Sequence, residues 1–324
     1  MIRIKLTRLR YFIRKQPWVA IFVYMTGNLW HALVHSRQDR QKLSFIYTEA
    51  IPENRVALCL RFRDEAPYLQ EWIEYYIAAG VDHFFLYNNY SKDSFASILK
   101  PYIDAGKVTL IEWPYSPASP AAEHDCIARA LPDFCWVGFL DADEFVVIRD
   151  GRSIPDYLDS FGNVPGVALH WYYFGSNGHR RRPDDWVIRA YTRRAENVNQ
   201  HFKVFVRPEQ VTRNRNSHNF YYRNARCAVR EDDRRVFGSM ASPGIANSAW
   251  INHYFVKSRQ DYLEKAARRS SLDRSGMREP SRRQSLVDQE MEKANDVVDL
   301  SALNYYNCRA AILLGLKQGA ECKV

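Results

Sequence analysis

FCWVGFLDADEFVV, residues 134–147, places three carboxylates between two apolar runs. They belong to Asp141, Asp143 and Glu144. An ionised carboxylate is costly to bury unless it is paired or binds a metal. We therefore expect the first apolar run to be a buried strand that the carboxylates terminate. Asp141 and Asp143 are two residues apart, so on an extended chain they would share one face.

The sequence before this stretch alternates apolar runs of strand type with segments of helical spacing. We expect strands at 55–62, 82–89 and 107–113, and helices at 66–80, 95–106 and 121–131. This order predicts βαβ units and an α/β fold with a mostly parallel, Rossmann-like sheet flanked by helices. Ligands of such sheets bind beyond the carboxyl ends of the strands.

Polar side chains follow three of the expected strands. They form the sets Arg63, Asp64, Glu65; Asn88, Asn89, Asp93; and Asp141, Asp143, Glu144. We expect the three sets to line one crevice. Paired aspartate oxygens suit Mg²⁺ or Mn²⁺, and such a cation neutralises a departing diphosphate. A D-x-D pair alone is a weak signal because turns and helix starts also produce it.

Five segments in order give the chain a specific resemblance. They are RFRDEAPYLQEWIEYYIAAGVDHFFLYNNYSKD (61–93), GKVTLIEWP (106–114), WVGFLDADEFVV (136–147), WYYFGSNGH (171–179) and INHYFVKS (251–258). Together they resemble the GT-A-type glycosyltransferases of the family 2-like and family 92-like group. The resemblance implies a GT-A fold and transfer of a hexosyl group with inversion. It also implies a nucleotide-sugar donor, a glycan or lipid-linked acceptor, and Mn²⁺ or Mg²⁺ as cofactor.

The resemblance also implies roles for individual residues. The metal ligands would be Asp141, Asp143 and His253. The nucleotide and its phosphates would be bound by Arg63, Asp64, Glu65, Asn88, Asn89, Asp93 and Lys257. The base that takes the acceptor proton is not singled out. Besides Glu144, the candidates are the acidic cluster Glu231, Asp232 and Asp233, and the pair Asp184 and Asp185; of these, Asp233 and Asp185 are the ones we predict. One departure is Glu123, where the family more often has glutamine.

Several alternatives stay open at this point. Glu144 could cap the segment that follows it, and His253 could be a hydrogen-bonded structural histidine beside Tyr254. The whole chain could be a non-catalytic carbohydrate- or nucleotide-binding protein on the same fold. The formal charge of +9 could indicate nucleic-acid binding. We do not expect this, because six basic residues fall within the first 16 positions and no nucleic-acid module is recognisable.

The N-terminal segment differs from the rest. Residues 1–16 are basic, and residues 16–36 contain no Lys, Arg, Asp or Glu. We expect residues 1–36 to contact a membrane surface, as an interfacial helix or a single span, or else to pack on the protein. Three regions are predicted: this segment with a linker (1–53), the GT-A domain (54–258) and a charged helical extension (259–324).

The six cysteines form no C-x-x-C pair, and several lie in apolar runs. We expect reduced thiols packed in a core, rather than a zinc site or a disulfide framework. This favours a cytoplasmic protein that is peripheral to the membrane, with single-pass anchoring as the alternative.

Overall fold

The computed structural model describes residues 55–115, 120–270, 287–316 and 324. They belong to one compact unit. The predicted membrane-associated segment, residues 1–36, lies outside the described residues. None of the helices in the described ranges is both long enough and apolar enough to cross a bilayer.

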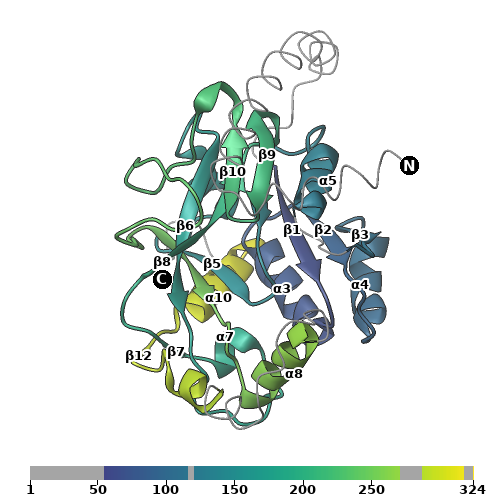
Figure 1. Cartoon of the computed structure of the whole chain (residues 1–324), viewed down its shortest axis with the longest axis vertical. Coiled ribbons are helices and arrows are strands. Elements are labelled where there is room, and N and C mark those ends of the chain that lie inside the picture. Colours follow the sequence, from purple (N-terminus) through teal and green to yellow (C-terminus); the bar gives the residue numbers. More distant parts are fainter. Residues whose placement is uncertain (1–54, 116–119, 271–286, 317–323) are drawn as a thin grey trace, which may run out of the picture. The chain divides into compact units, whose positions relative to one another are not determined.

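The first part of the unit is the βα series that the sequence predicts (Figure 1). In chain order its elements are β1 (Val56–Phe62), α3 (Ala66–Ala78), β2 (His83–Asn88), α4 (Phe95–Asp104), β3 (Val108–Glu112), α5 (Ala121–Ala130) and β4 (Trp136–Phe139). The four strands are parallel, in the order β3-β2-β1-β4. Every predicted strand and helix of this series is therefore confirmed.

The second part extends the same sheet with strands β8, β6, β11 and β5. β8 is antiparallel to both β4 and β6, β11 is parallel to β6, and β5 is antiparallel to β11. The elements are β5 (Glu144–Ile148), α6 (Ile154–Asp159), β6 (Gly166–Tyr173), α7 (Val187–Ala190), β7 (Arg193–Arg194), β8 (Asn199–Val206), η1 (Pro208–Gln210), β9 (Val211–Asn216), β10 (Asn219–Tyr222), η2 (Arg223–Ala225), β11 (Ala249–His253), α8 (Arg259–Ser270), β12 (Val297–Val298) and α10 (Ser301–Leu313).

The sheet is buried on both faces, which explains the continuous apolar runs of its strands. Alternate residues of β1 supply the two faces: Leu58 and Leu60 pack in one cluster with α3, and Ala57 and Cys59 pack in the other with α5. The predicted α/β class with a mostly parallel sheet is confirmed.

The chain passes from β4, in the middle of the sheet, to β5, at its edge, through only four residues. Four strand spacings in a flat sheet would amount to about 19 Å. A turn of four residues does not cover that distance, so the sheet has to curl and bring its edge back toward β4.

The residues of this connection do not form an extended segment. Ala142 and Asp143 lie in a turn, so the prediction that Asp141 and Asp143 share one face of extended chain is wrong. The side chain of Asp141 is 54% exposed, whereas that of Asp143 is 7% exposed. The turn reverses the chain between two strands, and it therefore gives the two carboxylates different environments.

The cysteines are also more varied than expected. Cys59, Cys126, Cys135 and Cys227 are free thiols. Cys308 is disulfide-bonded, so the prediction that all six thiols are reduced is wrong for this residue.

Candidate active site

The acidic turn, residues 141–144, is held by α3 and by its own last residue. Trp72 Nε1 donates to the carbonyl oxygen of Asp141 at 3.1 Å, and the Tyr76 hydroxyl donates to the carbonyl oxygen of Glu144 at 2.9 Å. Glu144 Oε2 accepts a hydrogen bond from the backbone N–H of Asp141 at 2.8 Å. The backbone of the turn is therefore fixed from both sides before any ligand binds.

Lys203, on β8, lies beneath the turn with only 1% of its side chain exposed. Its ammonium group donates to Asp141 Oδ2 at 2.9 Å and lies 3.3 Å from Glu144 Oε2. Glu144 is itself fully buried. Burial lowers the pKa of Lys203, but the two carboxylates raise it more, so the lysine stays charged.

Asp143 faces three cationic or ionisable groups. Lys265 Nζ, on α8, lies 2.6 Å from Asp143 Oδ2, and Lys257 Nζ lies 3.7 Å from the same oxygen. His253 Nε2, at the end of β11, lies 3.5 Å from Asp143 Oδ1. Burial raises the pKa of Asp143, but Lys265, Lys257 and His253 lower it further, and the net result is well below the usual range.

His253 is brought here by strand pairing. In the register of β11 it lies opposite Glu144 on β5 and opposite Tyr173 on β6. Burial lowers its pKa more than the neighbouring Asp143 raises it, so the ring is neutral at pH 7. Its Nδ1 atom is buried and has no hydrogen-bond partner among the described residues. Trp171 packs against the ring, with 4.4 Å between ring centroids.

Glu144 differs from the two aspartates. Burial raises its pKa to about 8, although Lys203 opposes this. One carboxylate oxygen, Oε1, has no hydrogen-bond partner among the described residues. Because Glu144 is fully buried and bonded to the turn backbone, its position suits holding the turn rather than contacting an acceptor.

The donor set fits a divalent cation in part. Within the described ranges, no three His, Cys, Asp or Glu side chains converge as a complete metal site. Mg²⁺ sites at phosphates, however, often use only one or two carboxylates together with substrate oxygens and water. The Asp143 carboxylate beside neutral His253 matches that pattern. The Lys265 ammonium, 2.6 Å from Asp143 Oδ2, shows that a positive charge is stabilised at this carboxylate.

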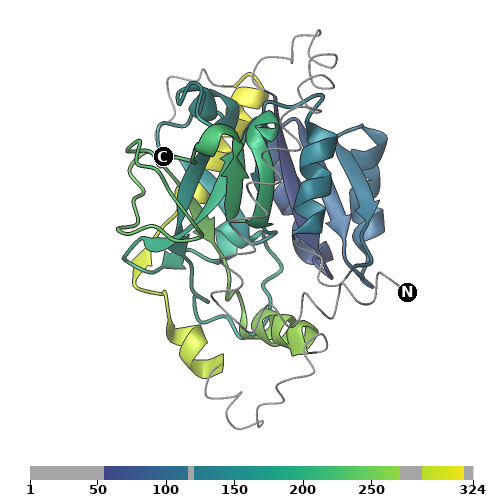
Figure 2. The same cartoon turned by 45° about the horizontal axis from the view of Figure 1, so that its top comes forward.

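Two cavities flank the acidic turn. One is lined by Cys59, Arg61, Ala122, Glu123, Phe139, Leu140, Asp141, Lys203 and Ser217. Within it, Glu123 is buried, and its Oε2 atom has no partner among the described residues. The hairpin β9–β10 supplies Ser217 and lies beside α5 (Figure 2), where the backbone N–H of Asn214 donates to His124 Nε2 at 3.3 Å.

The second cavity lies on the Asp143 side of the turn. It is lined by Tyr68, Arg182, Phe255, Val256, Lys257, Asp261, Glu264 and Lys265. Lys257 has a positive φ of 52° and its side chain is 5% exposed. Its ammonium lies 4.4 Å from the centroid of the Tyr68 ring. An anion that entered this cavity would meet two ammonium groups.

The two predicted nucleotide loops are joined to each other. The backbone N–H of Asp64 donates to Ser91 Oγ at 3.0 Å, and the backbone N–H of Lys92 donates to Asp64 Oδ1 at 2.6 Å. Asp93 Oδ2 accepts from the backbone N–H of Ala66 at 2.8 Å and so caps α3. Glu65, the residue at the N-cap position, makes no side-chain cap.

The amides of the second loop have structural partners as well. Asn88 donates to Glu112 at 2.8 Å and accepts from the backbone N–H of Ser91 at 3.0 Å. Asn89 donates to the carbonyl oxygen of Trp113 at 2.7 Å. Arg63 is different, because its Nε and Nη1 atoms are buried without a hydrogen-bond partner among the described residues. Of the predicted nucleotide-binding residues in the two loops, Arg63 therefore keeps the most donor capacity.

Asp233 does not lie near the acidic turn. The backbone N–H of Val229 donates to the carbonyl oxygen of Gly166, the first residue of β6, and Asp233 follows in the turn after Arg230. The His253 end of the site is opposite Tyr173, the last residue of β6, about 23 Å away along the strand. We therefore assign Asp233 no role in the reaction.

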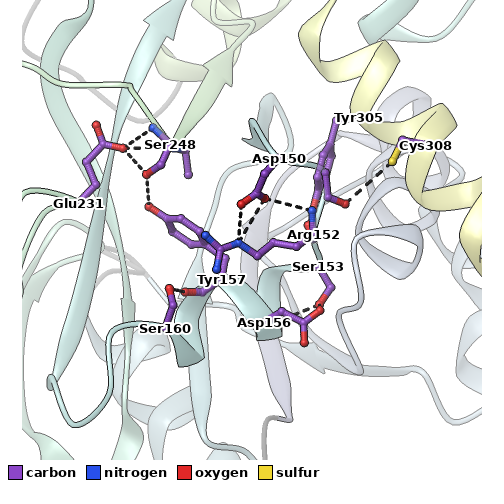
Figure 3. A network of polar contacts seen from close by, with 12 residues as sticks. Asp150, Arg152, Ser153, Asp156, Tyr157, Ser160, Glu231, Ser248, Tyr305 and Cys308 are labelled. Atoms are coloured by element: carbon purple, nitrogen blue, oxygen red, sulfur yellow. Dashed lines mark hydrogen bonds and ion pairs between the residues drawn. The ribbon is translucent and has the colours of Figure 1, made fainter. Parts of the chain in front are cut away.

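The neighbouring Glu231 is part of a structural network at the same far end (Figure 3). Its carboxylate accepts from the backbone N–H groups of Asn247 and Ser248, both at 2.6 Å. Ser248 Oγ in turn lies 3.0 Å from the Tyr157 hydroxyl. Glu231 thus fixes the start of β11, and His253 is at the end of that strand.

Asp185 is half exposed, and its Oδ1 atom accepts from the backbone N–H of Trp186 at 2.7 Å. It also forms an ion pair with Arg189 at 3.7 Å. Both contacts are local to the start of α7. These contacts give Asp185 a structural role at the start of α7, and we assign it no role in the reaction.

Sequence reasoning missed Lys203 and Lys265, the two lysines closest to the acidic turn. Lys203 could have been noticed, because NQHFKVFV (199–206) contains a single ammonium within an apolar strand. Lys265 gave no such signal, because it occurs in a segment in which charges of both signs are frequent.

Comparison with known proteins agrees with this architecture. The model of glycosyltransferase family 92 matches residues 55–237. Family 92 proteins of Ricinus communis and of Oryza sativa subsp. japonica are both 31% identical to the chain, over 163 and 161 residues. These matches cover 49% and 48% of the chain but only 29% and 27% of the relatives. The chain thus spans less than a third of the length of these relatives.

Similar solved structures are more distant. S. aureus TarS 1–349 in complex with UDP has a TM-score of 0.33 and 12% identity, over 48% of this chain and 47% of that one. Glucosyl-3-phosphoglycerate synthase from Mycobacterium tuberculosis, in complex with Mn²⁺, UDP and glucosyl-3-phosphoglycerate, has a TM-score of 0.26 and 15% identity, over 37% of this chain and 44% of that one. These scores are too low to transfer a site. The family model, however, matches more than half of the chain, and the chain therefore belongs to glycosyltransferase family 92.

Proposed function

We propose that the protein is a metal-dependent glycosyltransferase. It would move a hexosyl group from a nucleotide-diphosphate donor to a glycan or lipid-linked acceptor, with inversion at the anomeric carbon. The observation that carries this proposal is the acidic turn at the carboxyl end of β4, where Asp143 lies beside His253, Lys257 and Lys265. Family membership supports the same reaction class.

The charges of this site suit a diphosphate. The carboxylates of Asp141 and Asp143 face Lys203, Lys257 and Lys265, so fixed charges of both signs are close together. Such fixed positive charges would stabilise the negative charge that develops on a departing diphosphate. They are effective because they are already in place and need no reorganisation during the reaction. Lys257 and Lys265 are the residues that we assign to the diphosphate.

Asp143 and His253 would hold the divalent cation, Mn²⁺ or Mg²⁺, and Asp141 would be its further ligand. When bound, the cation supplies Lewis-acid neutralisation of the leaving group. Glu144 and Lys203 act through the other residues, because both are buried and they fix the conformation of the turn. Arg63, whose Nε and Nη1 atoms make no hydrogen bond within the described ranges, is assigned to the nucleotide.

The membrane surface remains a proposed partner through residues 1–36, and we propose a cytoplasmic protein that is peripheral to that surface. A lipid-linked acceptor would be consistent with such a location, because enzyme and acceptor would then meet at one surface. A non-catalytic binding protein on the same fold is the rival function. It predicts that a donor binds but that no sugar is transferred.

The test is thermal unfolding of the full chain with UDP, GDP, CDP, ADP and their common sugar conjugates, each with and without Mn²⁺. A ligand present at 100 times its Kd stabilises a protein by about 2.7 kcal/mol. For a unit of this size, that raises Tm by roughly 5 °C. The rise should require Mn²⁺ and should disappear in Asp143→Asn.

Asp104→Asn is the matched control, because this aspartate is exposed on α4 and pairs with Lys100. The control should keep the full rise in Tm. No rise with any nucleotide, with or without Mn²⁺, would contradict the proposal. A Mn²⁺-dependent rise without sugar transfer to glycan or lipid-linked acceptors would favour the binding protein.

A further inference from the structure

The first observation is that, within the described ranges, Lys265 is the cation closest to Asp143. Its ammonium is 2.6 Å from Asp143 Oδ2, closer than Lys257 at 3.7 Å and within hydrogen-bonding distance. Lys265 is 22% exposed, whereas Asp143 is almost fully buried. A partly exposed side chain therefore neutralises a buried carboxylate.

The second observation is that the start of α8 is fixed where it places Lys265. Asp261, in the first turn of α8, accepts hydrogen bonds from Ser258 Oγ at 2.6 Å and from Arg182 Nε at 2.5 Å. The Tyr68 hydroxyl also donates to Asp261. Lys265 follows one helical turn later, on the same face of the helix as Asp261. The backbone of α8 is thus anchored, and only the flexible lysine side chain has to move.

The third observation is that Lys265 also lines a cavity that an anion could enter. It lines the cavity on the Asp143 side of the turn together with Lys257 and Arg182. Its ammonium lies 4.2 Å from the centroid of the Phe255 ring, a favourable contact that keeps it at the rim of this cavity. A diphosphate in the cavity would compete with Asp143 for the same ammonium group.

From these contacts we propose that Lys265 is an internal counter-ion that couples cation binding to donor binding. Without a diphosphate, Lys265 neutralises Asp143 and opposes entry of a divalent cation. A bound diphosphate draws Lys265 away and frees Asp143 for the cation. The inference rests on the proposed function, because it takes the donor to be a nucleotide diphosphate.

The coupling has a measurable consequence. If the diphosphate raises the affinity for the cation by some factor, the cation raises the affinity for the diphosphate by the same factor. Part of that factor comes from direct contact between cation and phosphate, and this part does not depend on Lys265. Replacing Lys265 should remove only the part of the coupling factor that comes from its contact with Asp143. The variant should bind the cation more tightly in the absence of nucleotide and should show weaker coupling.

The experiment measures Mn²⁺ binding by the electron paramagnetic resonance signal of free Mn²⁺, without nucleotide and with saturating UDP or GDP. It compares wild type with Lys265→Met and Lys265→Gln, which keep most of the length of the side chain. Lys100→Met is the matched control, because Lys100 is an exposed helical lysine whose partner is Asp104. Asp143→Asn shows how much Mn²⁺ binds elsewhere.

We expect both Lys265 variants to bind Mn²⁺ about tenfold more tightly than wild type without nucleotide. We expect the enhancement by nucleotide to fall by a similar factor, and Lys100→Met to match wild type. Equal Mn²⁺ affinity of wild type and Lys265 variants without nucleotide would overturn the inference, whatever the donor is. If wild type binds no Mn²⁺ with either nucleotide while the Lys265 variants bind it alone, Lys265 opposes the cation as proposed, but its coupling to a nucleotide diphosphate is refuted and the proposed donor chemistry is wrong.

Discussion

Lys203→Met tests how the acidic turn is held. The substitution removes an ammonium group that is 1% exposed and lies 2.9 Å from Asp141 and 3.3 Å from Glu144. Glu144 is fully buried and would lose its only ion pair among the described residues. Methionine fills a similar volume, so the loss of charge compensation dominates over the change in packing.

The magnitude follows from the burial of the pair. Removing one partner of a buried ion pair costs about 3–5 kcal/mol, because the other charge is left uncompensated. Removing a partner of an exposed pair costs roughly 0–1 kcal/mol. Lys100→Met therefore serves as the control, because Lys100 and Asp104 are 72% and 60% exposed. A second variant, Lys203→Met with Glu144→Gln, removes both buried charges and should recover most of the loss.

The assay is urea unfolding of these three variants, of Glu144→Gln alone and of wild type at pH 9, above the pKa of about 8 that burial gives Glu144, with the free energy of unfolding taken from the linear extrapolation. The single variant should lose several times more stability than the control, and the double variant should lie between them. If Lys203→Met costs no more than Lys100→Met, the buried ion pair does not hold the turn. The same conclusion follows if the two substitutions in the double variant are additive, because then Lys203 and Glu144 do not interact.

Two further predictions concern groups outside the turn. Burial raises the pKa of Glu71 from 4.5 to about 7, although the N–H groups of Ile188 and Val187 oppose this. The folded state then holds a proton that the unfolded state has lost, so stability should fall by about 3 kcal/mol as pH rises from 4.5 to 7. Unfolding titrations should show that fall in wild type and not in Glu71→Gln. Glu231→Gln should lower Tm, because it weakens hydrogen bonds at the start of β11. It should leave the Kd for the nucleotide, measured by titration calorimetry, unchanged. Weaker nucleotide binding by this variant would mean that Glu231 affects the active site.

The sequence alone determined the βα series and the place of the acidic turn in it. These features are local: an apolar run makes a buried strand, helical spacing makes the next element, and a carboxylate cannot continue a buried strand without a partner. The strands β1 to β4 and the position of Asp141 and Asp143 after β4 follow from this pattern. The segments that carry the family resemblance are also contiguous, so they could be recognised without a structure.

Tertiary structure alone decided what surrounds the carboxylates. Lys203 and Lys265 are 62 and 122 residues from the aspartates that they contact. Pairing of β11 with β5 brings His253 beside the turn, and the direction of β6 takes Asp233 to the far end of the sheet. Partners so distant in the chain leave no periodic signal in the sequence, because their proximity depends on strand order and on the curl of the sheet. The charge balance around Asp143, and with it the response to cation and donor, is therefore a property of the fold.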